Sequence, residues 1–121
     1  KIEASQIKFR IRYFIDPPYY KDLYSSTTLT NNTWYNTTAV FTGAQTILYI
    51  NGVEDGTPIT TTFDRYTNNV NGAIGTYWYS GSAYAGDFNG ELGPISFYKS
   101  KALSPDEVLH NYNALKGRFG L

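Results

Sequence analysis

The chain has 121 residues, of which 41% are hydrophobic and 17% charged, and its ten basic and ten acidic residues cancel. This composition fits one folded domain with an apolar core and argues against intrinsic disorder. The balanced charge provides no basic surface, so neither nucleic acid nor a membrane is expected as a partner. The absence of cysteine excludes disulfides and thiolate chemistry.

The N-terminal third predicts strands separated by turns. Residues 8–15, KFRIRYFI, alternate between apolar and basic positions, which is typical of a half-buried strand. The following DPPYYKD, residues 16–22, is expected to be a loop because Asp-Pro-Pro cannot continue a central strand. TTLTNN, residues 27–32, predicts a short strand that enters an Asn-rich turn. TWYNTTAVFTG, residues 33–43, predicts the next strand, which closes at Gly43.

The middle of the chain contains a strong hairpin pattern. QTILYINGVEDG, residues 45–56, predicts a strand, a turn at Asn51-Gly52 and a short return strand. Asn-Gly favours this turn because both residues tolerate the positive φ that it needs. Residues 57–63 are expected to continue as β structure.

The last strands are expected between residues 69 and 100. The segment 69–90 predicts one strand near residues 73–79 and a Gly/Ser-rich loop after it. ELGPISFYKS, residues 91–100, predicts a further strand with Pro94 at an edge or bulge. Strand periodicity then predicts a set of buried core residues: Trp34, Val40, Leu48, Ile50, Ile95 and Phe97.

A single short helix is predicted from Ser104 to Lys116. Ser104 is a good N-cap, Pro105 suits the first helical position, and Glu107 completes a capping box. Gly117 is expected to provide the C-cap. A helix this short does not persist alone in water, so it must dock on the sheets. The predicted docking face consists of Val108, Leu109, Tyr112 and Leu115.

Five motifs occur in an informative order: WYNTTAVFTG, LYING, IG, GDFNGELGPISFY and ALSPDEV. In this order they resemble the laminin G-like branch of the concanavalin A-like lectin/glucanase superfamily, over about residues 33–115. The resemblance implies an all-β fold, a two-sheet antiparallel jelly roll with one short C-terminal helix that covers an end or edge of the sandwich. Fewer strands are visible than the family fold needs, and Lys1 is an unusual natural start. We therefore expect one domain over residues 1–121, the C-terminal part of a longer chain that lacks N-terminal strands here.

The final residues, NYNALKGRFGL, are similar to the tails of laminin G-like virion structural proteins from marine tailed phages. This resemblance implies a non-enzymatic domain of a head or tail fibre, located on the virion. Its partners would be other virion subunits or further copies of itself, and it could also bind a host-cell glycan. The alternative is a carbohydrate-binding or adhesion module of a secreted, extracellular protein.

The sequence contains no recognisable catalytic pattern. The glucanases of the superfamily carry a Glu-x-Asp-x-x-Glu run whose alternating carboxylates face one cleft, and no such run occurs here. His110 is the only histidine, which excludes a His-rich metal site. We expect no enzyme activity and no cofactor, and leave calcium open because some relatives bind it at the rim. The candidate calcium ligands, by residue type, are Asp64, Asn68, Asp87 and Asn89.

The segment TYWYSGSAYAGD, residues 76–87, combines aromatic and acidic residues in the way that sugar sites do. Pyranose rings present an apolar face and a polar edge, which suit an aromatic platform beside a carboxylate. The candidate ligand-binding residues are Trp78, Tyr79, Tyr84 and Asp87. Strand alternation places Trp78 on the opposite face from Tyr77 and Tyr79, so the four cannot all form one platform. The competing interpretation is that this surface contacts a neighbouring subunit.

Overall fold

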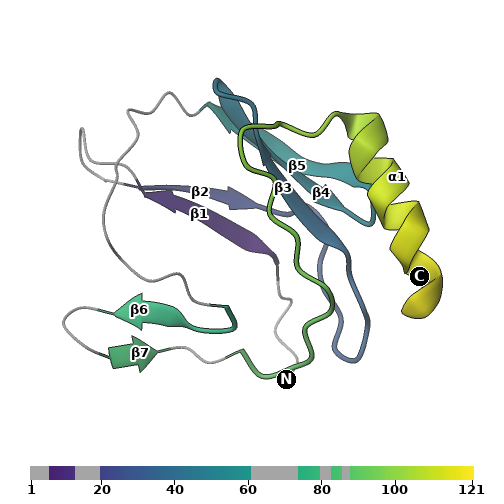
Figure 1. Ribbon diagram of the computed structural model, residues 1–121. Coiled ribbons are helices and arrows are strands. Elements are labelled where there is room, and N and C mark those ends of the chain that lie inside the picture. The colour runs from purple at the N-terminus through teal and green to yellow at the C-terminus, as the bar shows by residue number, and fades with distance from the viewer. Residues whose placement is uncertain (1–5, 13–19, 61–73, 80–82, 86–87) are drawn as a thin grey trace. The chain divides into compact units, whose positions relative to one another are not determined.

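The computed structural model describes residues 6–12, 20–60, 74–79, 83–85 and 88–121 (Figure 1). As predicted, these residues form antiparallel β structure followed by one short helix. The chain divides into two units, the first made of Lys1–Tyr66 with Ser100–Leu121 and the second of Thr67–Lys99. The elements are β1 (Lys8–Arg12), β2 (Tyr20–Tyr24), β3 (Thr37–Phe41), β4 (Gln45–Ile50), β5 (Val53–Thr60), β6 (Tyr77–Tyr79), β7 (Ala83–Ala85), α1 (Pro105–Leu115) and a 3-10 turn (Lys116–Arg118).

The centre of the first unit is the antiparallel sheet β3-β4-β5, in which β4 is buried on both faces. On one face Leu48 and Ile50 pack with Leu23 of β2. On the other face Val40 and Tyr49 pack with Val108 of α1. The sheet therefore lies between the β1-β2 hairpin and the helix. Val40, Leu48 and Ile50 are buried as predicted.

The β4-β5 hairpin turns at Asn51-Gly52 as predicted, with φ of 51° and 79°. The Asn51 Oδ1 accepts a hydrogen bond of 2.9 Å from the Asn36 N–H, and the Asn51 N–H donates to the Asn36 carbonyl over 2.8 Å. A Cβ atom on Gly52 would lie 2.9 Å from Cδ1 of Tyr112 and 3.1 Å from Cδ1 of Leu109. Glycine is thus required here twice, for the turn and for the close approach of α1.

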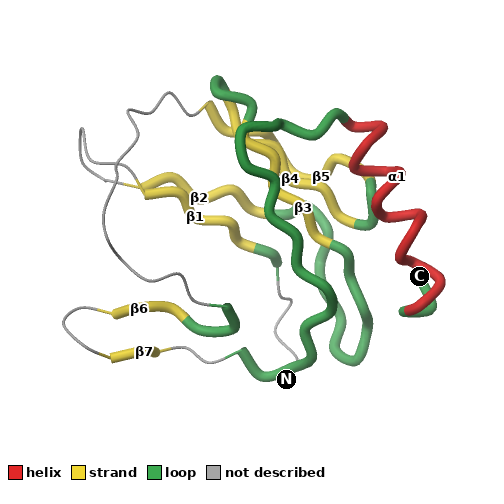
Figure 2. Tube along the Cα trace, viewed as in Figure 1, coloured by secondary structure: helices red, strands yellow, loops and turns green. Residues whose placement is uncertain are grey.

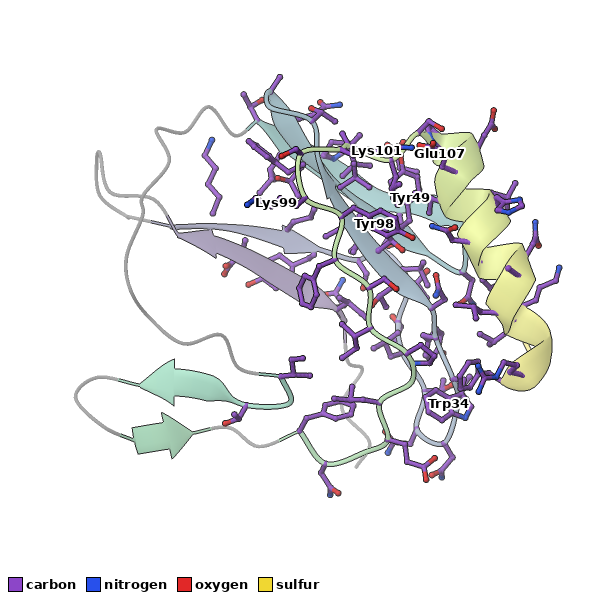
Figure 3. The ribbon with its side chains drawn as sticks, viewed as in Figure 1. Trp34, Tyr49, Tyr98, Lys99, Lys101 and Glu107 are labelled. Atoms are coloured by element: carbon purple, nitrogen blue, oxygen red, sulfur yellow. The ribbon has the colours of Figure 1, made fainter. Side chains whose placement is uncertain are left out.

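The helix α1 begins with the predicted capping box. The Ser104 Oγ accepts from the Glu107 N–H over 3.2 Å, and the Glu107 carboxylate accepts from the Ser104 N–H over 2.9 Å. Lys101 forms a salt bridge with the same carboxylate (Figure 3). The Lys101 ammonium, together with the Ser104 N–H, lowers the pKa of Glu107. These contacts fix where the helix starts.

Docking of α1 is confirmed, with two corrections to the prediction. Val108 is fully buried and Tyr112 and Leu115 are half-buried, whereas Leu109 is 41% exposed because it lies at the margin of the contact. Gly117 does not cap the helix: the chain continues through the 3-10 turn, and Gly120 adopts the positive φ of 68°. The N–H groups of Phe119 and Leu121 both donate to the Lys116 carbonyl.

A second anchor joins β5 to the segment that follows β2. The Asp55 carboxylate accepts hydrogen bonds from the N–H groups of Ser26 and Thr27 and from the Thr27 hydroxyl. The next residue, Gly56, has a φ of 78°, and a Cβ atom there would lie 2.3 Å from the Tyr24 carbonyl oxygen. Burial tends to raise the pKa of Asp55, but the three hydrogen-bond donors outweigh it and hold the pKa below its usual value.

Several strand predictions were wrong in the first unit. Residues 20–22, predicted as loop, belong to β2, because they pair with residues 10–12 of β1. The strand predicted over 27–32 is reduced to a single bridge at Leu29 before the turn at Asn32, whose φ is 59°. The strand predicted over 33–43 begins only at Thr37, and the predicted strand residues 13–15 and 61–63 lie outside the described residues.

The second unit also differs from expectation. The predicted loop after β6 contains the strand β7, and residues 91–98 form no strand (Figure 2). Gly93 and Pro94 explain why residues 91–98 form no strand. Glycine has no side chain to pack on a sheet, and proline has no N–H to donate to a neighbouring strand. Ile95 and Phe97, predicted as core, are 48% and 85% exposed. Among the described residues, no helix is long and apolar enough to cross a membrane.

Replacing Gly52 tests the contact between the turn and α1. Gly52→Ala combines a strained positive φ with overpacking against Tyr112, and we expect it to cost about 2–4 kcal/mol of unfolding free energy. Gly43→Ala is the matched control, because Gly43 has a φ of 94° but nothing within 4 Å of its would-be Cβ. Chemical denaturation should show the larger loss for Gly52→Ala. Equal losses would mean that α1 does not press on the turn.

The Asp55 anchor predicts a pH dependence. Because the folded-state pKa is lowered, the stabilisation is present above the unfolded-state pKa of about 3.9 and is lost as the pH falls through the folded-state value. Asp55→Asn should therefore lower stability by about 1–3 kcal/mol at neutral pH, and the difference from wild type should shrink in acid. Glu54→Gln, at the adjacent residue, is the control. Parallel pH profiles for wild type and Asp55→Asn would contradict the anchor.

Candidate functional site

The candidate site predicted at residues 76–87 falls on the β6-β7 hairpin of the second unit. The strand register pairs Tyr77 with Ala85, Trp78 with Tyr84, and Tyr79 with Ala83. Residues paired across an antiparallel ladder share one face of the hairpin. Trp78 and Tyr84 thus hold paired positions of the backbone ladder, and Tyr79 holds the next position along β6. Asp87, the fourth candidate, lies outside the described residues.

The sequence predicted that Trp78 alternates with Tyr77 and Tyr79. It did not predict β7, and therefore it did not predict that Trp78 pairs with Tyr84. Ala83-Tyr84-Ala85 lies in a segment rich in glycine and serine, which favours a loop. The one available sign was Tyr84 itself, an aromatic residue of high strand propensity. Pairing with β6, and not the local sequence, sets the backbone position of Tyr84 opposite Trp78.

The base of this hairpin is held by a backbone contact. The Phe88 N–H donates to the Gly75 carbonyl over 2.7 Å, which closes the ends of the chain that enter and leave the two strands. Gly75 has a φ of 76°, and its would-be Cβ lies 3.6 Å from Leu92. The hairpin therefore has a fixed root within the second unit.

The described residues do not gather carboxylates as a hydrolase site would. Glu54 and Asp55 are successive residues of β5 and so point to opposite faces. The hydrogen bonds from Ser26 and Thr27 already occupy the Asp55 carboxylate. Within the described ranges no group of three or more His, Cys, Asp or Glu residues could hold a metal ion. Of the candidate calcium ligands, Asn89 is exposed, and Asp64, Asn68 and Asp87 lie outside those ranges.

An aromatic contact that sequence reasoning missed lies in the first unit. Trp34, labelled in Figure 3, was predicted as core but is only half-buried. Its ring packs against Phe119, with centroids 4.8 Å apart and planes tilted by 51°. The Arg118 guanidinium lies 5.9 Å from the centroid of the Phe119 ring. The C-terminal residues thus cover part of Trp34, a contact between distant positions that no local pattern indicates.

A comparison with protein families confirms the resemblance to the concanavalin A-like lectin/glucanase superfamily. A laminin G-like family model, described as the Concanavalin A-like lectin/glucanases superfamily, matches residues 2–109. The chain therefore belongs to the concanavalin A-like lectin/glucanase superfamily. This membership, together with the antiparallel sheets and the terminal helix, confirms the predicted all-β fold class with one short C-terminal helix.

One solved structure is similar across most of the chain. It is the 2.1 Å crystal structure of residues 221–444 of an S-layer domain-containing protein from Clostridium thermocellum ATCC 27405. The sequence identity is 24% and the TM-score 0.58, over 88% of this chain and 51% of that one. The chain thus spans about half the length of this structural relative, and the similarity concerns the fold. No curated protein sequence matches the chain.

The contact between Trp34 and Phe119 can be measured by a double-mutant cycle. Trp34→Ala and Phe119→Ala should each destabilise the protein, and the double variant should lose less than the sum because the ring contact is lost only once. We expect a coupling of about 0.5–1.5 kcal/mol in unfolding free energy. Tyr112→Ala combined with Phe119→Ala is the control pair. Strict additivity of Trp34→Ala and Phe119→Ala would show that the rings do not interact.

Proposed function

We propose that this domain is a non-catalytic carbohydrate-binding or adhesion module, and that one face of the β6-β7 hairpin contacts the sugar. The proposal rests on the register that pairs Trp78 with Tyr84. Aromatic faces bind the apolar C–H surface of a pyranose ring, and their polar atoms can meet its hydroxyls. Asp87, two residues after β7, would supply the carboxylate for the sugar's polar edge. Tyr79, on the opposite face, would support the hairpin instead.

Membership of a lectin-containing superfamily supports a binding role. The S-layer domain-containing relative supports a location outside the cell or on a surface, which is where such a module would meet its ligand.

We propose no hydrolysis, because the described carboxylates lie apart or are engaged in hydrogen bonds. Release of reducing sugar by the purified chain would overturn this part of the proposal. Sugar binding through an aromatic face needs no metal, so chelation by EDTA should leave it unchanged.

A second candidate is that the module is carried on a phage particle, as part of a head or tail fibre. It is favoured by the sequence NYNALKGRFGL at the C-terminus, which is similar to the tails of laminin G-like virion structural proteins. In that setting the partners would be neighbouring virion subunits or copies of this chain, and aromatic faces suit subunit contacts as well as sugars. Cosedimentation of the chain with purified particles would support this candidate. A chain found only as a free monomer would contradict it.

The sugar-contacting face is tested on a glycan array with three variants. Trp78→Ala and Tyr84→Ala should each weaken binding of a positive glycan about tenfold or more, which corresponds to about 1.4 kcal/mol. Tyr79→Ala is the matched control, since it removes a tyrosine from the other face of the same strand. If no glycan binds the wild type, or if Tyr79→Ala weakens binding as much as the other two, the proposed face is wrong. Loss of an oligomer in Tyr84→Ala would favour a subunit contact.

A further inference from the structure

Two tripeptides of the chain match the pattern of an N-glycosylation acceptor, which is asparagine, any residue but proline, and then threonine or serine. They are Asn31-Asn32-Thr33 and Asn36-Thr37-Thr38. The proposed sugar-binding hairpin uses neither of them. Because so short a pattern also recurs by chance, the local structure around each asparagine has to decide whether a transferase can use it.

The first tripeptide lies on an open turn. Asn31 and Asn32 form this turn, and both they and Thr33 are exposed. The Asn31 side chain makes no hydrogen bond to another described residue, so its amide is available to react. The Thr33 hydroxyl donates to the Asn31 carbonyl over 3.4 Å and lies 3.0 Å from the Thr30 Oγ1. Lifting the turn into a transferase would therefore break exposed hydroxyl contacts and no strand pairing.

The second tripeptide is tied into the sheet. Asn36 is half-buried, its N–H donates to the Asn51 Oδ1 over 2.9 Å, and its carbonyl accepts from the Asn51 N–H over 2.8 Å. Thr38, which carries the hydroxyl of this tripeptide, lies within β3 and pairs with Tyr49 of β4. Modification of Asn36 in the folded chain would require this end of the ladder to open. The chain thus contains a closed acceptor pattern beside the open one.

We propose that Asn31 is a modification site, the acceptor of an N-linked oligosaccharide, and that the folded chain accepts none at Asn36. The donor would be an oligosaccharide joined to a polyisoprenyl diphosphate. The Asn31 Nδ2 forms a bond to the anomeric carbon of the donor, and the bond from that carbon to the diphosphate oxygen breaks. The polyisoprenyl diphosphate leaves, and Nδ2 gives up one of its two protons.

The surroundings of Asn31 suit an attached oligosaccharide. An N-linked glycan is bulky and solubilising, and on this exposed turn it would displace no buried side chain. Residues 25–53 contain no charged residue, so a glycan would hydrate a stretch of the chain that lacks charge for this purpose. The inference rests on the proposed location outside the cell or on a surface. It does not depend on the β6-β7 hairpin, which belongs to the other unit.

The folded chain can be tested directly as an acceptor. We would incubate it with a purified single-subunit oligosaccharyltransferase of the archaeal type and a polyisoprenyl-diphosphate oligosaccharide, and measure the intact mass. The mass should increase by one oligosaccharide. Chymotrypsin cleaves after Trp34 and Tyr35, so the two asparagines fall in different peptides, and the glycan should be on the peptide that contains Asn31.

Variants of the first tripeptide test the chemistry. Asn31→Gln and Thr33→Val should each lower the incorporation at least tenfold, because the first removes the acceptor amide and the second removes the hydroxyl of the pattern. Thr33→Ser retains a hydroxyl and should retain the modification. Asn36→Gln is the matched control at the second tripeptide and should leave the incorporation unchanged.

An unfolded acceptor separates the effect of the fold from that of the sequence. A synthetic peptide of residues 28–40 should be modified at both asparagines, because no ladder protects Asn36 in it. The proposal is overturned if the folded chain takes up no oligosaccharide from a transferase that modifies a standard acceptor peptide, or if Asn36 of the folded chain is modified as much as Asn31. A peptide modified only at Asn31 would overturn the structural reason given for Asn36. All of these results are masses, so they stand apart from whether the β6-β7 hairpin binds a sugar.

Discussion

The first unit depends on the burial of β4 on both of its faces. A strand buried on one face needs one partner layer, but β4 places Leu48 and Ile50 against the β2 layer and Tyr49 against the helix layer. Each contact excludes water from apolar area at about 25 cal/mol per Å², so neither layer can leave without exposing half of this strand. The short C-terminal helix is thereby explained: it supplies the second cover that the central strand requires.

The close backbone approaches follow from that constraint. Bringing α1 onto the sheet forces it against the turn at Gly52, and bringing β2 onto the opposite face forces the Tyr24 carbonyl against Gly56. Side chains then fix each approach: Asn51 ties the turn to Asn36, and Asp55 ties β5 to the segment after β2. Burial of apolar surface sets which layers meet, and these polar contacts set where along the strands they meet.

The sequence could predict those features of the fold that a few neighbouring residues determine, such as turns and helix caps. The Asn51-Gly52 turn and the capping box at Ser104 are of this kind, because the side chains that determine them lie within four positions. The strands β2 and β7 were missed because their local composition favours loops and only pairing with β1 and β6 makes them strands. The same limit applies to the candidate sites. Trp78 and Tyr84 were named from composition, but their placement opposite one another depends on the register of a strand that was not predicted.

The turn at Asn51-Gly52 also has a chemical consequence for the lifetime of the protein. Asn-Gly is the dipeptide most prone to spontaneous deamidation, in which the glycine nitrogen attacks the asparagine side-chain carbonyl to form a cyclic imide. Here that carbonyl oxygen is engaged by the Asn36 N–H, and Gly52 is buried beneath Tyr112 and Leu109. Of the two other Asn-Gly dipeptides, Asn71-Gly72 lies outside the described residues, and Asn89-Gly90 is exposed and carries no such restraint among the described residues. Chemical ageing should therefore affect Asn89 before Asn51 and spare the turn on which the helix rests, and peptide mapping of stored protein would show the order in which the amides are lost.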